Sequence, residues 1–225
     1  SYAPAQRGHT GQIKKAARML LAAKRPIIYA GGGVVQGGGS ELLTKLARQL
    51  NYPVTNTLMG LGAYPGTDRQ FLGMLGMHGL YEANLAMHGC DLMINIGARF
   101  DDRITGRIAD FSPNSRKVHV DIDPSSINKV IRVDVGIIGD IATVLEEALA
   151  LWKARGSKVN KDGLAKWWAQ IAQWRVVKCL SYKNSTAVIK PQYALERLEA
   201  LTKGYDRYIT TEVGQHQMWA AQYLG

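Results

Sequence analysis

Three groups of residues in the sequence have the side chains and the spacing to bind a phosphorylated ligand. Two glycine runs, 31–33 and 37–39, would let the backbone approach a diphosphate closely, and the helix that follows would offer free N–H groups. The segment GARFDDR at 97–103 contributes Arg99 and Arg103, whose guanidinium groups suit phosphate or carbonyl oxygens. The carboxylate of Asp121 suits the hydroxyl groups of a ribose.

Each group also has an interpretation without a ligand. The glycines lack the regular GxGxxG spacing and would then form only a tight turn, while the charges at 97–103 would pair with one another at the surface. Asp123 and Asp140 each precede an expected helix, where capping explains a carboxylate. The five histidines share no ligand spacing with Cys90 or Cys179, and neither a nucleophile elbow nor an acid–base pair is recognisable. We therefore predict no metal site and no catalytic residue.

The elements that position these groups alternate between strand and helix. Strands are expected at 26–30, 53–57, 91–96 and 117–122, and helices after Thr10, after Ser40, over 80–88 and over 141–153, with a long loop at 58–79. The strands are apolar on both faces, which predicts an α/β fold whose parallel sheet has helices on both faces. Ligands bind such sheets at the carboxyl ends of the strands, where all three groups lie.

The pattern of the sequence changes after residue 155. We expect a linker over 156–190 that contains one helix, at 164–182. A new unit begins at Pro191, with a helix over 192–202, a strand over 208–211 and the cluster EVGQH at 212–216. This organisation predicts a ligand-binding domain over 1–155 and the first part of another domain over 191–225.

Composition favours a soluble globular protein that can bury a core. Of the 225 residues 46% are hydrophobic, no apolar run approaches the roughly 20 residues of a membrane-spanning helix, and no signal peptide is recognisable. The net charge of +10 permits nucleic-acid binding, but Lys and Arg are scattered, which favours a basic surface that faces a diphosphate or an acidic partner domain. We predict neither nucleic acid nor membrane as a partner. Both cysteines are expected to be buried free thiols of a cytoplasmic protein.

Six strings together carry a resemblance that no single motif would. They are RPIIYAGGGV (25–34), PVTNTLMGLGAYPG (53–66), LGMHGLYEANLAMHGCDLMINIGARFDDRITG (75–106), KVHVDIDPSSINK (117–129), IIGD (137–140) and EVGQHQMWAAQ (212–222). In this order they closely resemble catalytic subunits of the acetohydroxyacid synthase (acetolactate synthase) family over nearly the whole chain. GMHG, GARFDDR and GQHQMWAAQ together are highly specific for that family.

The resemblance implies a protein of three α/β domains, whose middle domain is sirtuin-like (DHS-like) and binds FAD in an extended pose. Residues 12–155 match this domain, and the flavin performs no net redox step in the family's main reaction. The implied FAD contacts are Gly31, Gly32, Gly33, Thr57, Leu58, Leu75, Gly76, Met77, His78, Gly97, Ala98, Arg99, Asp101, Arg103, Asp121, Ile122 and Asp140.

The resemblance also implies the reaction of the whole enzyme. Thiamine diphosphate, held with Mg2+, serves to decarboxylate pyruvate and to join the hydroxyethyl unit to a second 2-oxo acid, pyruvate or 2-oxobutanoate, at the start of branched-chain amino-acid synthesis. The residues that match the stretch holding its diphosphate are Val213, Gly214, Gln215 and His216. The family's activating glutamate and its GDG…N magnesium segment are not among these 225 residues, so this chain alone is expected to be inactive.

The family further implies a homo-oligomer, dimer or tetramer, a regulatory small subunit and a bacterial cytoplasmic location. Two other functions stay open. One is that of another FAD-containing thiamine-diphosphate carboligase, such as glyoxylate carboligase, although GARFDDR and GQHQMW disfavour it. The other is that of a stand-alone nucleotide-binding module, which would prefer NAD to FAD. Nucleic-acid binding is supported by charge alone.

Overall fold

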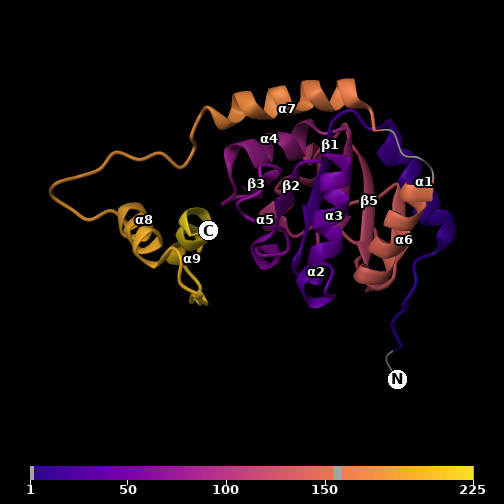
Figure 1. Cartoon of the computed structure of the whole chain (residues 1–225), viewed down its shortest axis with the longest axis horizontal. Coiled ribbons are helices and arrows are strands. Elements are labelled where there is room, and N and C mark those ends of the chain that lie inside the picture. The colour runs from indigo at the N-terminus through magenta and orange to yellow at the C-terminus, as the bar shows by residue number, and fades with distance from the viewer. Residues whose placement is uncertain (1–2, 155–158, 225) are drawn as a thin grey trace.

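The computed structural model describes residues 3–154 and 159–224 of the chain. Within these residues, six strands form one parallel sheet in the order β3-β2-β1-β4-β5-β6, and helices cover both of its faces (Figure 1). The predicted fold class is therefore confirmed. After α7, an extended segment leads to α8 and α9, which lie together at one end of the molecule (Figure 1).

The strands are β1 (Pro26–Ala30), β2 (Val54–Asn56), β3 (Phe71–Met74), β4 (Leu92–Ile96), β5 (Arg116–Asp121) and β6 (Val135–Ile138). The α-helices are α1 (Thr10–Ala22), α2 (Gly32–Gln36), α3 (Ser40–Leu50), α4 (Tyr81–Gly89), α5 (Asp102–Thr105), α6 (Ile141–Ala154), α7 (Lys161–Arg175), α8 (Pro191–Thr202) and α9 (Gln215–Tyr223). Three short 3-10 helices are η1 (Leu58–Gly60), η2 (Ile108–Asp110) and η3 (Pro124–Ser126).

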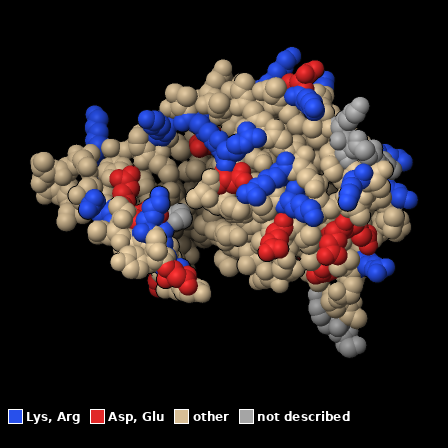
Figure 2. Space-filling view, in the orientation of Figure 1, with Lys and Arg blue, Asp and Glu red and all other residues tan. Residues whose placement is uncertain are grey.

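Charged side chains of both signs are spread over the surface. On the face drawn in Figure 2, Lys and Arg are interspersed with Asp and Glu instead of forming one continuous patch. Among the described residues, no helix combines the length and the apolar character needed to cross a bilayer.

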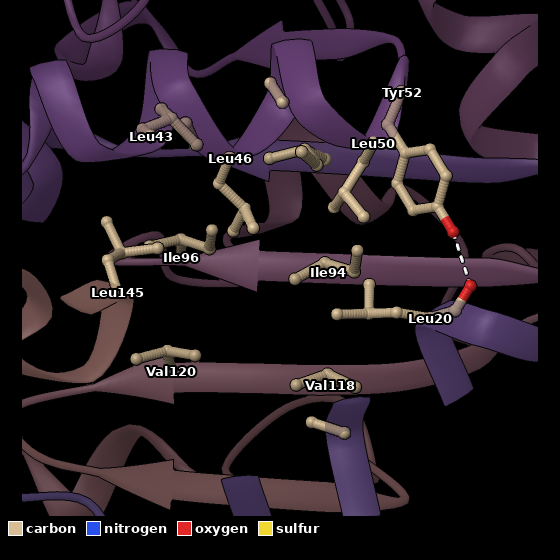
Figure 3. Packing of buried hydrophobic residues seen from close by; sticks show 14 of the residues in the cluster. Leu20, Leu43, Leu46, Leu50, Tyr52, Ile94, Ile96, Val118, Val120 and Leu145 are labelled. Atoms are coloured by element: carbon tan, nitrogen blue, oxygen red, sulfur yellow. Dashed lines mark hydrogen bonds between the residues drawn. The ribbon is translucent and has the colours of Figure 1, made fainter. Parts of the chain in front are cut away.

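Alternate residues of the central strands serve two separate cores. Ile28 of β1 and Ile94 of β4 belong to the larger core, which α1, α3 and α6 cover (Figure 3). Tyr29 of β1 and Met93 of β4 turn to the opposite face, where α4 and α7 pack. Successive residues of a strand point to opposite faces, so burial of both faces requires the continuous apolar runs seen in the sequence.

Each helix over the larger core packs on the sheet through one apolar face. Leu43, Leu46 and Leu50 of α3 follow one another at helical spacing and point at the sheet (Figure 3). After the helix, the buried hydroxyl of Tyr52 donates a hydrogen bond to the carbonyl of Leu20 at the end of α1. This bond ties α1 and α3 together across the same core.

The strand order reverses between β1 and β4, the two central strands. From β1 the sheet continues outward through β2 and β3, and from β4 it continues in the opposite direction through β5 and β6. The connections that leave β1 and β4 therefore diverge and open a crevice at the carboxyl ends, which is where open α/β sheets bind ligands.

The two outer strands, β3 and β6, were not expected. The region 58–79 is not a continuous loop, because 71–74 pair with β2 at one edge of the sheet. β6 pairs with β5 at the other edge. Both strands have four residues and contain a glycine, so neither has a long enough apolar run to be recognised.

The C-terminal part agrees only partly with expectation. The helix at 192–202 is present as α8, but 208–211 form no strand, and Tyr208 is 91% exposed. The strand prediction was wrong because these residues have no neighbouring strand to pair with in the described chain. The helix expected to reach residue 182 ends at Arg175. The predicted boundary at 155/156 lies outside the described residues.

The two cysteines lie in different environments. Cys90 is buried, its Sγ lies 3.4 Å from the Oγ of Ser112, and burial raises the pKa of its thiol to about 11. Cys179 is exposed, contrary to expectation, because α7 ends at Arg175 and does not carry the cysteine into a packed helix.

Candidate functional site

A pocket of about 650 Å³ opens where the strand order reverses, a volume within the roughly 300–1,000 Å³ usual for small-molecule sites. The residues expected from the sequence that line it are Gly32, Gly33, Thr57, Leu58, Gly97, Ala98, Arg99, Asp101, Arg103, Asp121, Ile122 and Asp140. The structure thus brings together residues from the turns after four different strands and from the start of α6.

The turns after β1 and β4 touch each other through their backbones. A Cβ atom on Gly31 would lie 2.3 Å from the carbonyl oxygen of Gly97 and 2.5 Å from the Cα of Ala98. The N–H of Gly33 donates to the same Gly97 oxygen at 3.0 Å, and Gly97 itself has a φ of +60°. Side chains are therefore excluded at this contact. Gly31 lies at the contact but does not line the pocket.

The turn after β2 closes on the turn after β1. Thr57 caps η1 by accepting a hydrogen bond from the N–H of Gly60 at 2.9 Å, and its own N–H donates to the carbonyl of Ala30 at 3.0 Å. A Cβ on Gly60 would lie 2.5 Å from that Ala30 oxygen. These contacts hold Thr57 and Leu58 against the pocket.

Two arginines reach the pocket from the turn after β4 and from α5. The side chain of Arg99 is 74% exposed and lies 3.4 Å from the carboxylate of Asp101. That of Arg103 is 70% exposed and lies 4.0 Å from Asp102. Exposed ion pairs at such distances contribute little, so both guanidinium groups are available to an anionic ligand.

The carboxylates at the pocket differ in their roles. Asp121 ends β5 with its side chain 12% exposed; one carboxylate oxygen accepts from the N–H of Asp123 at 2.9 Å and the other lies 3.6 Å from Nε2 of His119. Asp123 caps η3, as its capping interpretation predicts. Asp140 caps α6 by accepting from the N–H of Thr143 at 2.9 Å, and it also lines the pocket.

Residues 75–78, which the resemblance places in contact with the flavin, lie beside the pocket and do not line it. Leu75 is buried in the smaller core, and the side-chain amide of Asn84 holds both the N–H and the carbonyl of Gly76, at 2.8 and 2.9 Å. The N–H of Met77 donates to the carbonyl of Arg103 at 2.8 Å, so Met77 adjoins a lining residue, and His78 follows it in the chain. Their contact with a ligand stays a prediction.

The cluster at 213–216 lies away from this pocket, at the start of α9. Val213 is 79% exposed, and Gly214 precedes the first helical residue, Gln215. Farther along α9, the side-chain amide of Gln222 donates to the carbonyl of His78 at 2.9 Å. The predicted role of residues Val213, Gly214, Gln215 and His216 in binding a diphosphate is tested by none of these contacts.

Several lining residues were not singled out from the sequence. They are Gln36, Met59, Ile104, Ser126 and Ile141, together with Asp123, which was weighed mainly as a cap; Gly37, from the second glycine run, also lines the pocket. Ser126 lies within the string KVHVDIDPSSINK and Ile104 directly follows GARFDDR, so a position in or next to a named motif was the available signal. Among residues 3–154 and 159–224, no cluster of three His, Cys, Asp or Glu side chains could hold a metal ion.

Comparison with known proteins relates the chain to a family and to individual relatives. Residues 13–148 match the family described as "Thiamine pyrophosphate enzyme, central domain". The chain is 52% identical over 221 residues to the acetolactate synthase large subunit of Haemophilus influenzae, covering 98% of this chain and 38% of the relative. It is 49% identical over 223 residues to the isozyme 3 large subunit of Escherichia coli, covering 99% of this chain and 39% of the relative.

Proposed function

Because this chain belongs to the thiamine pyrophosphate enzyme family through its central domain, we propose that it is part of an acetolactate synthase large subunit and that its pocket binds FAD. One observation carries the cofactor proposal: a single pocket at the reversal of strand order collects the glycine turn, the two arginines and Asp121. An extended dinucleotide can reach all of these groups at once, whereas a mononucleotide would leave at least one without a partner.

The residues at the pocket fit such a ligand. Gly32 and Gly33 let the backbone come close to a diphosphate, and Arg99 and Arg103 supply positive charge for it. Asp121 offers a partly buried carboxylate to ribose hydroxyls. Four further proposed contacts, Leu75, Gly76, Met77 and His78, do not line the pocket; their segment adjoins it through the bond between Met77 and Arg103. In this proposal FAD is bound without a net redox step.

The proposed enzyme extends beyond this chain, which spans about two fifths of the length of the relatives it matches. We propose a central domain over 1–155, a linker over 156–190 and the start of a thiamine-diphosphate domain over 191–225, in which the cluster at 213–216 holds the cofactor's diphosphate. Pyruvate and 2-oxobutanoate are the proposed substrates, with Mg2+ ligands outside these 225 residues. The relatives reported above are acetolactate synthases, which favours this activity over glyoxylate carboligase.

The proposed assembly is a dimer or tetramer with a regulatory small subunit in the bacterial cytoplasm. Both relatives are named as large subunits, which supports a small partner, and the two free thiols suit a reducing compartment. The intermixed charges in Figure 2 give no support to a nucleic-acid partner.

Titration of the purified chain with dinucleotides tests the cofactor proposal. We expect FAD to bind with a change in flavin fluorescence and to compete out NAD, because the glycine turn, the arginines and Asp121 converge on one pocket. Circular dichroism must first show that the chain is folded. A folded chain that binds NAD more tightly than FAD, or binds neither, would contradict the proposal.

Catalysis by the chain alone is a separate prediction. We expect no acetolactate from pyruvate when the 225-residue chain is supplied with FAD, Mg2+ and thiamine diphosphate, because the family's activating glutamate and magnesium segment are not in the sequence. Acetolactate is measured over several hours against a full-length acetolactate synthase as positive control. Sustained turnover would show that the catalytic apparatus lies within these residues.

A further inference from the structure

Three buried polar side chains lie side by side across the centre of the sheet. In the strand register, Tyr29 of β1 is the partner of Asn95 of β4, and Asn95 is the partner of His119 of β5. Partners in register on parallel strands point to the same face of a sheet. All three side chains are fully buried, at 0% exposure, on the face covered by α4 and α7. We call Tyr29, Asn95 and His119 the polar row.

The first member of the row holds the backbone of the arginine turn. The hydroxyl of Tyr29 donates to the carbonyl of Arg99 at 3.0 Å, and its ring lies 6.0 Å from that of Phe100. Burial, reinforced by the negative charge of Asp101, raises the pKa of Tyr29 well above its ordinary value. The hydroxyl therefore remains a donor at every pH at which the protein would work.

The other two members bind the backbone of the preceding residue, Ala98. The amide of Asn95 donates to the carbonyl of Ala98 at 2.8 Å and accepts from the N–H of Ala98 at 3.1 Å. The Nε2 of His119 lies 3.0 Å from the same Ala98 carbonyl, which can only accept, so Nε2 is the donor. Phe100 packs edge-on against the imidazole, with ring centroids 5.3 Å apart, and closes the row from solvent.

A purely apolar row would pack this face without the cost of burying polar groups. The three side chains do not bond to one another, and their hydrogen bonds converge on two consecutive residues, Ala98 and Arg99. Both of these residues line the pocket. The polar row is thus a set of buried side chains that all bind the backbone of the turn after β4, at the carboxyl ends of the strands.

A fourth polar side chain in the same register provides a contrast. Thr55 of β2 is the partner of Tyr29, is equally buried, and donates to the carbonyl of Gly73 at 2.8 Å. Gly73 belongs to the edge strand β3 and does not line the pocket. Thr55 therefore makes the same kind of bond to a backbone segment that does not line the pocket.

We propose that Tyr29, Asn95 and His119 are positioning residues of the cofactor pocket, which fix the Ala98 and Arg99 peptides so that the Arg99 side chain enters the pocket in one orientation. The identity of the ligand as FAD rests on the proposed function, but the effect of the row on the turn does not. One measurement without ligand tests the effect of the row on the turn, and a second measurement with FAD tests its effect on binding.

The first measurement is hydrogen–deuterium exchange of the segment 97–103 in the ligand-free 225-residue chain. Tyr29→Phe removes one hydroxyl and should speed exchange of this segment about fivefold, the effect of losing a net hydrogen bond of about 1 kcal/mol. Thr55→Val, the matched control, should leave 97–103 unchanged and affect only the segment around Gly73. Equal exchange of 97–103 in Tyr29→Phe and in the parent would overturn the proposal.

The second measurement is the FAD dissociation constant of the same variants, beside their midpoints of urea unfolding. We expect Tyr29→Phe to weaken FAD binding by roughly fivefold, whereas Thr55→Val loses comparable stability without loss of affinity. For His119, the Gln variant keeps an N–H donor and should retain more affinity than the Leu variant. If affinity follows unfolding midpoint alone across all four variants, the row is merely structural. If the folded parent does not bind FAD, the proposed cofactor fails while the exchange result still decides the role of the row.

Discussion

Replacing Gly31 with alanine is expected to lower the free energy of unfolding by about 3 kcal/mol and to abolish FAD binding, because the new methyl group would force two backbone turns apart. Its Cβ would lie 2.3 Å from the Gly97 oxygen and 2.5 Å from the Cα of Ala98. Neither atom belongs to a flexible side chain, so the clash can be relieved only by moving the turn after β4. That turn carries Arg99. Displacement of the turn would move Arg99 away from the other residues that line the pocket.

Gly66→Ala is the matched control for this substitution. A Cβ on Gly66 meets no atom within 4 Å, and the change should leave both stability and FAD affinity near those of the parent. Urea unfolding followed by circular dichroism gives the first quantity, and flavin fluorescence gives the second. A Gly31→Ala chain with parental stability would mean that the turns after β1 and β4 are not in the contact described.

The central strands could be predicted from sequence because burial on both faces leaves a continuous apolar run. The run at 26–30 ends in glycines, and the run at 91–96 ends in Gly97, so both the strands and their carboxyl ends were recognisable. From these ends, the general rule for ligand sites in parallel sheets was enough to group the glycine turn, the segment 97–103 and Asp121. Contacts at Thr57, Leu58, Ile122 and Asp140 were expected from the family resemblance alone.

Short strands that form only by pairing with another strand could not be predicted from the local sequence in the same way. β3 and β6 have four residues each and form strands through pairing with β2 and β5. The converse failure occurred at 208–211, where a sequence of β-branched and aromatic residues finds no partner strand in the described chain. Local pattern alone does not contain this information, because a strand is stabilised by its neighbours.

The polar row illustrates a second limit. Tyr29 and His119 lie inside apolar strands, and without the register they are indistinguishable from ordinary core residues. Only the alignment of β1, β4 and β5 shows that they reach the backbone of one turn. Similarly, Ile141 lines the pocket because α6 begins beside the turn after β1, a contact between residues more than a hundred positions apart.

Arg99→Ala is expected to weaken FAD binding by roughly tenfold to a hundredfold, because a charge-assisted contact contributes about 1.5–3 kcal/mol where it is desolvated. In the ligand-free chain the guanidinium is 74% exposed and 3.4 Å from Asp101, so binding can recruit it without breaking a strong internal pair. Loss of the Arg99 guanidinium should therefore raise the dissociation constant for FAD and leave the free energy of unfolding within about 0.5 kcal/mol of that of the parent. Titration with FAD and urea unfolding measure the two quantities.

Arg107→Ala distinguishes a specific contact from a general loss of positive charge. Arg107 lies four residues beyond Arg103, is 81% exposed, pairs with Asp110 at 3.2 Å and does not line the pocket. Both variants lose one unit of charge, and screening at physiological salt suppresses the long-range part of that loss beyond about 8 Å. We expect Arg107→Ala to bind FAD within about twofold of the parent, a difference below 0.5 kcal/mol. If the two variants weaken binding equally, or if folded Arg99→Ala binds as the parent does, Arg99 does not contact the cofactor and the turn after β4 serves the pocket through its backbone alone.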